Sequence, residues 1–483
     1  DLLSPAAPAM LPQSLAERSS QLQHRPGIDA GPEGLRSRNY CIPPPGGPAR
    51  WHRFSSGQQG FSKRRPQPQA FQVPKSAKQA LLHGASPGRS LSPKFPGMKN
   101  NDLFSNPNFV LGIVGGGQLG KMLLQETRRL DLATHVLDPS PQAPSRLACD
   151  RFSVGNLLDY QAVYDLGKSS EVVTIEIENV NTQALKALEA EGVEVYPQPG
   201  VIDLIKSKIR QKQFYQEASI PTAAFYACAD RASAQARFAN LSGEWVWKLD
   251  TGGFDGRGVK MLSADTNWSD LPDAPCLLEA KQDFAKELAV VVARGKTGEI
   301  RSFPPVEMDF HPEANLVEYV FSPALLPQSK WAQAQELAER LAEKLGIVGI
   351  LAVELFYLPS GEWLVNEIAP RVHNSGHLSI EGNYTSQFEQ HLRAILGLPL
   401  GATDSLQSAV MVNLVGEEGH NGPVRYLGLE KALTYPGVYP HLYGKAETRP
   451  FRKMGHITVI NPSLEQARQI AREIKATVKV ISR

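Results

Sequence analysis

Apolar runs and amphipathic stretches alternate along the chain from Asn108 onward. FVLGIVG runs into a glycine-rich turn, and the following KMLLQETRRL has the apolar spacing of an amphipathic helix. THVLDPSP predicts a second strand that ends in Asp138, and VVTIEIENV (172–180) and VEVYPQP (193–199) predict two more. Strands separated by helical spacers favour a parallel sheet, so residues 108–200 are predicted to form a Rossmann-like N-terminal domain.

The pattern changes after residue 200. A helical stretch leads to WVWKLDTGGFDGRGVKML, which predicts two strands joined by a glycine-rich hairpin loop. A longer mixed region ends near Leu398, and SAVMVNLVG and HITVIN then predict strands before a final helix from Leu464 to Ile474. We therefore expect a mixed α/β (α+β) protein with a central domain at 201–398 and a small β-rich C-terminal domain at 399–483.

Residues 1–97 lack this periodicity and hold 15 of the 37 prolines. Proline fixes φ and removes a backbone donor, so PPPGGP and RRPQPQ cannot propagate a helix or a central strand. We interpret the segment as a disordered, non-catalytic leader. Because Met98 heads the folded pattern, we also interpret the leader as foreign to the native protein; a basic transit peptide is the alternative.

Charge separates this leader from the rest of the chain. The formal charge is +2, but residues 1–97 carry 13 Lys and Arg against 4 Asp and Glu, and the remainder carries 38 against 45. The acidic remainder gives no electrostatic reason to expect a nucleic acid partner. The four cysteines are far apart, and no apolar run approaches the ~20 residues of a membrane helix. We expect a soluble, cytoplasmic protein without a membrane partner.

The turn Gly115–Gly120 matches G-x-G-x-x-G between a predicted strand and a predicted helix. Amides at a helix N-terminus attract anions, and Asp138 lies where dinucleotide-binding proteins place a ribose-binding acid. Three interpretations stay open at this point: a dinucleotide, another anionic ligand, or close packing alone.

A second glycine-rich segment, Thr251 to Gly258, includes Arg257. Ordering a glycine costs about 0.5–1 kcal/mol more than ordering an alanine, and proteins tolerate this where amides must fold over phosphates. Lys248 on the preceding strand places an ammonium group near the loop. The segment predicts a phosphate flap, with an ordinary flexible hairpin as the alternative. It is not a Walker A loop, because no G-K-[ST] follows.

Glu354 and Glu367 lie on two apolar segments joined by the turn SGEW. Across such a hairpin both carboxylates are predicted to face the same side, with the Asn366 carbonyl beside them. Two carboxylates plus nucleotide phosphates suit Mg²⁺. The alternative is that both are solvent-facing residues of alternating strands.

RVHNSGH, residues 371–377, follows directly. Five of its seven residues donate or accept hydrogen bonds, which is too many for a core strand. We expect this segment to line a polar substrate pocket, although a lone histidine is usually structural.

Taken in order, GGGQLG, E-x-E-N-V, K-x-D-T-G-G-F-D-G-R-G, the acidic pair Glu279 and Glu287, and N-E-x-A-P-R-x-H-N-S-G-H resemble the 5-(carboxyamino)imidazole ribonucleotide synthetase family of the ATP-grasp superfamily. The resemblance covers residues 108–460. It implies ATP-dependent carboxylation of 5-aminoimidazole ribonucleotide by bicarbonate, through carboxyphosphate, with release of ADP and phosphate, in purine biosynthesis. It also implies an ATP-grasp fold and a homodimer.

The resemblance implies roles for individual residues. ATP phosphates would meet Lys208, Lys248 and the flap, which comprises Gly253, Phe254, Asp255, Gly256, Arg257 and Gly258. Adenine would meet Glu279, Ala280, Lys281 and Gln282, and ribose would meet Glu287. Magnesium would be held by Glu354 and Glu367, with Asn366. Met308 stands where some relatives place a histidine near the nucleotide.

The second set surrounds the ribonucleotide. Its predicted wall comprises Gly117, Gln118, Leu119, Glu176, Glu178 and Asn179, and Arg452 and Lys453 would meet its phosphate. Bicarbonate and the amine would be oriented by Arg371, His373, Asn374, Ser375 and His377. Three alternatives remain: an ATP-grasp ligase with another acceptor, a nicotinamide oxidoreductase, and a non-catalytic nucleotide-binding protein. The presence of Glu354, Glu367 and Lys248 argues against the last of these. The oxidoreductase leaves the flap and the carboxylate hairpin unexplained.

Overall fold

The computed structural model describes residues 103–252, 258–311 and 316–483. The predicted leader and residues Gly253 to Arg257 of the predicted flap lie outside the described residues. Within the described ranges, no helix is both long enough and apolar enough to cross a membrane.

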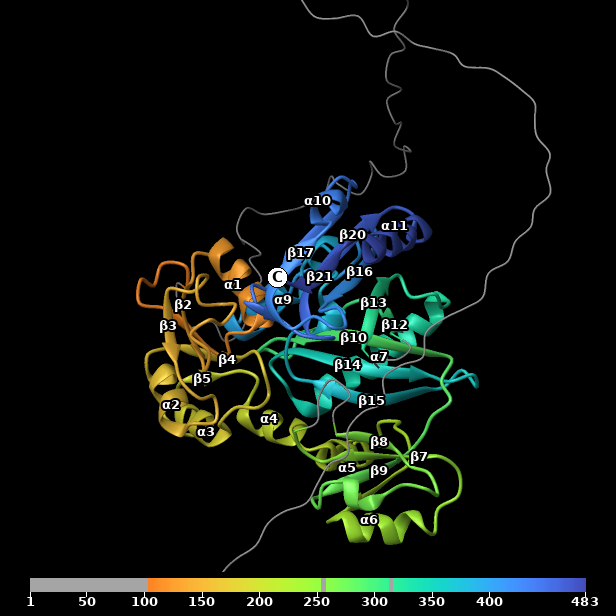
Figure 1. Cartoon of the computed structure of the whole chain (residues 1–483). Coiled ribbons are helices and arrows are strands. Elements are labelled where there is room, and N and C mark those ends of the chain that lie inside the picture. Colours follow the sequence, from red (N-terminus) through yellow and green to blue (C-terminus); the bar gives the residue numbers. More distant parts are fainter. Residues whose placement is uncertain (1–102, 253–257, 312–315) are drawn as a thin grey trace, which may run out of the picture. The chain divides into compact units, whose positions relative to one another are not determined.

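The N-terminal segment forms a five-stranded parallel sheet in the order β3-β2-β1-β4-β5 (Figure 1). Its strands are β1 (Val110–Val114), β2 (Ala133–Asp138), β3 (Arg151–Val154), β4 (Val172–Ile175) and β5 (Glu194–Val195). Buried residues of α2 (Tyr160–Lys168) and α3 (Thr182–Ala190) pack on one face of the sheet. Those of α1 (Gln118–Arg129) pack on the opposite face. The predicted Rossmann-like arrangement is confirmed.

Three details of this sheet differ from the prediction. The strand β3 was not predicted, because RFSV is short and half exposed. The strand predicted at 172–180 ends at Ile175, and the side chain of the next residue, Glu176, accepts a hydrogen bond from the Gly120 N–H of α1. The strand predicted at 193–199 is reduced to two residues, and Pro199 begins helix α4 (Pro199–Ile205).

A four-stranded antiparallel sheet follows, in the order β6-β9-β7-β8. Its members are β6 (Phe225–Cys228), β7 (Trp245–Leu249), β8 (Val259–Met261) and β9 (Cys276–Ala280). β7 and β8 are antiparallel neighbours with Lys248 opposite Val259, so the predicted glycine-loop hairpin is confirmed. Helices α5 (Lys208–Glu217) and α6 (Arg231–Phe238) contact this sheet at β9.

The largest sheet has nine strands, in the order β15-β14-β10-β12-β13-β16-β20-β18 with β11 beside β10. The strands are β10 (Lys286–Arg294), β11 (Ile300–Ser302), β12 (Val306–Phe310), β13 (Val317–Ser322), β14 (Gly349–Tyr357), β15 (Trp363–Ala369), β16 (Ser408–Val415), β18 (Val438–Leu442) and β20 (Lys453–Asn461). Leu288, Val290 and Val292 of β10 pack with helix α7 (Gln328–Leu345). Val291 and Ala293 pack with helix α9 (Gln387–Leu396). Burial on both faces explains why these strands read as continuous apolar runs.

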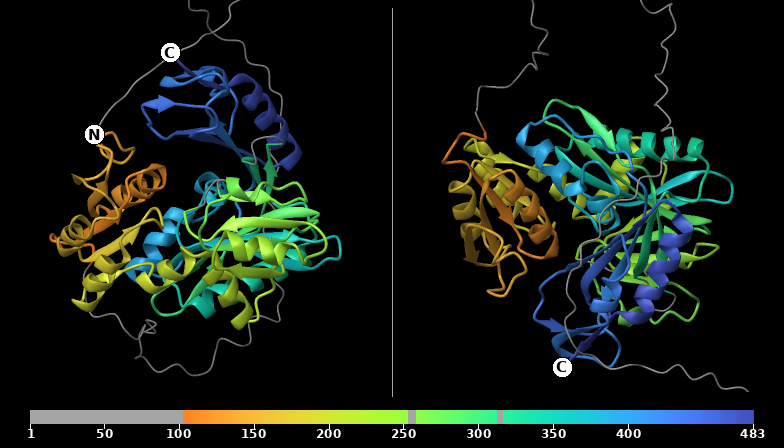
Figure 2. Two further views of the ribbon diagram at one scale, coloured as in Figure 1. Left: turned by 60° about the horizontal axis from the view of Figure 1, so that its bottom comes forward. Right: turned by 90° about the horizontal axis from the view of Figure 1, so that it is seen from above.

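The C-terminal strands continue this sheet, because β16 pairs with β13 in antiparallel register. The predicted β-rich C-terminal segment therefore contributes β16, β18 and β20 to the same sheet as the central strands. A small three-stranded sheet does form there, in the order β19-β17-β21, from β17 (Gly422–Leu427), β19 (Glu447–Thr448) and β21 (Lys479–Ser482). The predicted final helix is α11 (Leu464–Thr477), which runs along β16 and β20 (Figure 2).

The α9 residue His391 joins three elements in the core. Its Nδ1 accepts a hydrogen bond from the Ile350 backbone N–H (3.2 Å), and its Nε2 lies 2.9 Å from Thr174 Oγ1. Because Nδ1 is the acceptor, the proton resides on Nε2. Burial lowers the pKa of His391 to about 4, so the folded protein keeps this imidazole neutral.

We expect this histidine to destabilise the protein in acid. In the unfolded chain His391 has a pKa near 6.5, so it is protonated below that pH. In the folded chain it stays neutral down to about pH 4, so acid favours the unfolded state. In the parent chain the free energy of unfolding, measured by urea denaturation, should fall between pH 7.5 and pH 5.5. In His391→Asn this fall should be smaller by about 1 kcal/mol. Thr174→Val, which leaves the imidazole buried, should keep the parent's difference. An undiminished difference in His391→Asn would contradict the assignment.

Candidate functional site

The hairpin β14–β15 brings Glu354, Asn366 and Glu367 together. The register between the two strands shifts, from Val353 opposite Ile368 to Leu355 opposite Val365. This bulge places two consecutive residues, Asn366 and Glu367, opposite Glu354, and bulges commonly re-aim side chains beside active sites. The predicted convergence of both carboxylates and the amide is therefore confirmed, through an irregularity that a regular hairpin lacks.

Negative charge is concentrated at this hairpin. Burial, and then repulsion from Glu367 and Glu287, raise the pKa of Glu354 well above its ordinary value. Burial, and then Glu367, raise the pKa of Glu287 on β10 to about 7. For Glu367, whose side chain is 49% exposed, burial opposes ionisation, but the Lys208 and Lys248 ammonium groups lower its pKa overall. A hard cation at this position would relieve the repulsion.

The oxygen donors suit magnesium. Among the described residues, no group of three or more His, Cys, Asp or Glu side chains forms a metal site by itself. Two carboxylates and one amide oxygen are nevertheless the set that Mg²⁺ uses when nucleotide phosphates and water supply the remaining ligands. The residues present therefore fit a magnesium ion that arrives with a nucleotide.

Two lysines face these carboxylates from neighbouring elements. Lys208 Nζ, at the start of α5, lies 3.4 Å from Glu367 Oε2. Lys248 Nζ, on β7, lies 2.7 Å from Glu279 Oε1 and 3.4 Å from Asn366 Oδ1. The structure thus gathers the predicted nucleotide residues of three elements around one cluster.

A third lysine, Lys212, belongs to the cluster and was not predicted. Its Nζ lies 2.7 Å from Glu279 Oε2 and donates a hydrogen bond to Thr222 Oγ1 (2.6 Å), and its side chain is only 4% exposed. The Glu279 carboxylate is therefore held by two ammonium groups. Lys208 and Lys212 are four residues apart on α5, and that spacing places them on one helix face. This spacing was the signal available in the sequence.

The segment predicted to meet adenine begins at the end of β9 with Glu279. The Glu279 carboxylate itself pairs with Lys212 and Lys248. Gln282 Nε2 donates to the Ala280 carbonyl (2.9 Å), and Lys281 Nζ pairs with Glu244 (2.8 Å). At the end of the flap, Gly258 has φ +71° and its carbonyl accepts from Leu249 N–H (2.8 Å).

The first glycine turn holds an anion that belongs to the protein itself. Gly120 N–H at the start of α1 donates to Glu176 Oε2 (2.6 Å), and a Cβ on Gly117 would lie 2.2 Å from Glu176 Oε1. Burial raises the pKa of Glu176, against the opposing effects of the Gly120 amide and the Arg371 charge. Asp138, the suggested ribose acid, instead accepts from Gly116 N–H (2.8 Å). A carboxylate stands where a dinucleotide phosphate would bind.

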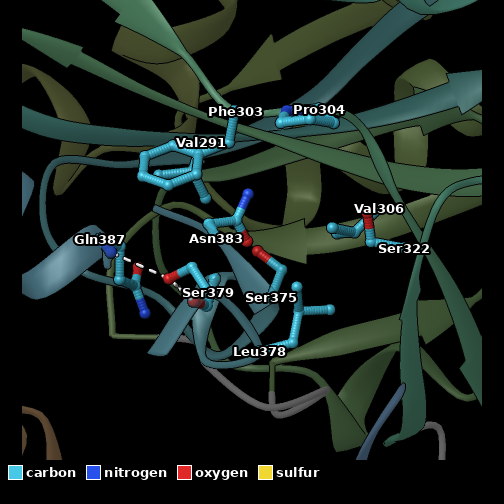
Figure 3. Close-up of a pocket in the computed structure, with 11 residues that line it drawn as sticks. Val291, Phe303, Pro304, Val306, Ser322, Ser375, Leu378, Ser379, Asn383 and Gln387 are labelled. Atoms are coloured by element: carbon cyan, nitrogen blue, oxygen red, sulfur yellow. Dashed lines mark hydrogen bonds between the residues drawn. The ribbon is translucent and has the colours of Figure 1, made fainter. Parts of the chain in front are cut away.

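RVHNSGH connects the carboxylate hairpin to the segment that follows β4. Arg371 Nε lies 2.9 Å from Glu178 Oε1, and His373 Nε2 lies 3.6 Å from Glu354 Oε1. His373 Nδ1 lies 3.0 Å from Ser375 Oγ in the short helix η3 (Asn374–Gly376). Burial, and then the positive charges of Arg371 and Lys453, lower the pKa of His373 to about 3. Ser375 also lines a small cavity of about 10 Å³, enough for about one water molecule (Figure 3).

The remaining predicted residues behave differently. Leu119 packs in the core, so only its backbone can line a pocket. Arg452 donates to the Glu447 carbonyl (2.7 Å), whereas the Lys453 charge acts on His373 and Glu354. Gln118 begins α1, and Asn179 is exposed after β4. Met308 is buried among Val306, Val320 and Met411 and serves the core.

Comparison with known proteins agrees with this architecture. Residues 109–206 match the ribonucleotide synthetase preATP-grasp domain, residues 213–388 the ATP-grasp domain, and residues 409–470 the phosphoribosylaminoimidazole carboxylase C-terminal domain. The chain is 37% identical to N5-carboxyaminoimidazole ribonucleotide synthase of Synechococcus elongatus, over 74% of this chain and 91% of that protein. The Brucella melitensis enzyme of the same name is 36% identical, over 74% and 97%.

Solved structures show the same relation. The N5-carboxyaminoimidazole ribonucleotide synthetase of Thermotoga maritima is 40% identical with a TM-score of 0.71, over 78% of this chain and all of that one. The Aspergillus clavatus enzyme, in complex with ADP and 5-aminoimidazole ribonucleotide, is 32% identical with a TM-score of 0.70, over 76% and 98%.

Proposed function

The chain belongs to the family of N5-carboxyaminoimidazole ribonucleotide synthases, ATP-dependent carboxylating ligases of purine biosynthesis, and from this membership we propose how its own residues perform the reaction. The substrates are ATP, bicarbonate and 5-aminoimidazole ribonucleotide. The 3.6 Å approach of His373 to Glu354 carries the proposal, because it joins the nucleotide cluster to RVHNSGH. The ATP phosphates, held by the nucleotide residues, would therefore lie next to the bicarbonate and the amine, held by RVHNSGH.

Lys208, Lys248 and the flap bind the ATP phosphates in this proposal, and Glu287 binds the ribose. Glu354 and Glu367, with Asn366, hold magnesium, which when bound would neutralise phosphate charge. Lys212 keeps a counter-charge on Glu279 when Lys248 turns to the phosphates. Exclusion of water from the site would protect the reactive intermediates.

The chemistry proceeds in two steps. A bicarbonate oxygen attacks the γ-phosphorus, the bond to the β-phosphate oxygen breaks, and ADP leaves. Such transfer needs positioning and charge neutralisation more than covalent help. The exocyclic amine then bonds to the carbon of carboxyphosphate, the bond from carbon to the phosphate oxygen breaks, and phosphate leaves with the electron pair. The amine gives up one proton to the departing phosphate or to water.

The second half of the pocket orients these groups. Arg371, His373, Asn374, Ser375 and His377 face bicarbonate and the amine, and Lys453 and Arg452 attract the ribonucleotide phosphate. The turn at Gly117 to Leu119, with Glu176, Glu178 and Asn179, forms the ribonucleotide wall. The ion pair between Arg371 and Glu178 links RVHNSGH to this ribonucleotide wall. The expectations of a homodimer and of a cytoplasmic location stay predictions.

Measurement of ADP release tests the proposal. With Mg-ATP supplied, we expect ADP only when bicarbonate and 5-aminoimidazole ribonucleotide are both present. Glycinamide ribonucleotide in place of the acceptor is the control, because it offers an amine on a ribonucleotide without the imidazole ring. Equal ADP release with either acceptor would point to a different ligase, and the proposal would fall.

A further inference from the structure

Gln387, the first residue of α9, lies directly behind RVHNSGH and is fully buried. Its Oε1 accepts from the His373 backbone N–H (2.8 Å), and its Nε2 donates to the His373 carbonyl (2.7 Å). The same Nε2 lies 3.1 Å from Nδ1 of His377. One side chain therefore binds both ends of the segment from His373 to His377.

These contacts determine which way the amide points. A backbone N–H can only donate and a carbonyl can only accept, so the two His373 groups distinguish the oxygen of Gln387 from its nitrogen. The NH₂ group has two protons. One is used by the His373 carbonyl, and the other points at His377, so Nδ1 of His377 must be the acceptor. The His377 proton then resides on Nε2.

Packing leaves little freedom for either partner. A Cβ on Gly376 would lie 2.4 Å from Gln387 Oε1, so only glycine allows this approach. Ser379 Oγ donates to the Gly376 carbonyl (2.5 Å) and accepts from Gln387 N–H (2.9 Å), the bond drawn in Figure 3. The segment and the start of α9 thus form one hydrogen-bonded unit.

The His377 ring is also held on its faces. It stacks on Phe388 (5.8 Å between centroids) and on His456 (4.7 Å). Burial, and then unfavourable electrostatic interactions with His373, His441, Lys453 and Arg371, lower the pKa of His377 well below its ordinary value. Within the described part of the chain, no group is hydrogen-bonded to its Nε2. The ring is thus neutral, and its Nε2–H can donate a hydrogen bond to a ligand.

We propose that Gln387 is a positioning residue that locks His377 as the neutral Nε2–H tautomer, so that His377 serves carboxylation as a hydrogen-bond donor to an oxygen of the bicarbonate-derived group and not as a general base. The naming of that oxygen rests on the proposed function. The tautomer lock does not, because it follows from contacts within the free protein.

Nitrogen NMR of the full chain tests the lock directly. In protein labelled with ¹⁵N-histidine, long-range proton–nitrogen spectra distinguish a protonated ring nitrogen from an unprotonated one, and His377→Asn assigns the signal. We expect an unprotonated Nδ1 and a protonated Nε2 from pH 6 to 8.5. A protonated Nδ1 anywhere in that range would overturn the lock, whatever reaction the protein performs.

Gln387→Glu tests the consequence. An ionised carboxylate only accepts, so at pH 8.5 the His377 proton should move to Nδ1, and kcat should fall at least ~10-fold with an unchanged KM for ATP. Gln390→Glu is the matched control, since Gln390 is equally buried on α9 but pairs with Gly401 (2.9 and 2.8 Å). It should leave the His377 signal and kcat unchanged.

Two results would sink the proposal. If Gln387→Glu kept a protonated Nε2, Gln387 would not set the tautomer. If the proton moved but kcat stayed at the parent value, His377 would not act as the donor. Should Gln387→Glu fail to fold, the spectrum of the parent chain still decides the lock, and Gln387→Met, which removes both amide groups at similar volume, replaces it in the kinetics.

Discussion

Glu367→Gln is expected to lower kcat at least ~100-fold, the scale of losing one electrostatic stabiliser in an active site. Glutamine has nearly the same shape but no charge, so it cannot balance Lys208, 3.4 Å away, or complete the pair of carboxylates with Glu354. Because the Glu367 side chain is half exposed, folding should be little affected. Steady-state ADP release over a range of magnesium concentrations measures the effect, and the magnesium requirement should rise.

The control is Glu362→Gln in the turn of the same hairpin, where the carboxylate is exposed and accepts from Ser360 Oγ (2.8 Å). That variant should keep the parent rate. Near-normal ADP release by Glu367→Gln would show that this carboxylate holds no metal, and the assignment of the hairpin would be withdrawn.

Lys248→Met is expected to lower kcat/KM for ATP at least ~100-fold, again on the scale of a lost charge stabiliser. The ammonium group lies between Glu279 and Asn366, at the point where the flap strand meets the carboxylate hairpin. Methionine retains the chain length without the charge, and Glu279 would then keep only Lys212. Initial rates at varied ATP, with the other substrates saturating, measure the loss.

Lys260→Met on the neighbouring strand β8 is its control, because Lys260 is exposed. We expect unchanged kinetics there. If Lys248→Met altered the KM for 5-aminoimidazole ribonucleotide and left that for ATP alone, Lys248 would belong to the other half of the site.

Local patterns were sufficient for much of the fold. The strand, glycine turn and helix from Val110 to Arg129 were predicted because turn chemistry and apolar spacing are written in adjacent residues. The hairpin β7–β8, whose strands flank the flap, and the hairpin β14–β15, whose strands flank SGEW, were predictable for the same reason. The short strand β3 was missed, because half-exposed strands of four residues carry almost no periodic signal.

The candidate site divides in the same way. Glu354, Glu367, Lys248 and RVHNSGH stood out because polar residues within apolar segments are costly to bury without a partner. Lys212 and Gln387 did not stand out, since a lysine and a glutamine on amphipathic helices are ordinary. Their importance arises from partners far away in sequence: Glu279 for Lys212, and His373 and His377 for Gln387.

By itself the sequence determined the Rossmann-like start, both hairpins and the resemblance to one ligase family, because each depends on neighbours in the chain; the residue roles that it suggested stay predictions. The tertiary structure alone decided what fills the first glycine turn, which carboxylate each lysine pairs with, and which nitrogen of His377 bears the proton. It also decided that the C-terminal strands extend the central sheet. These features depend on distances between groups scores of residues apart, and only packing of the whole chain sets such distances.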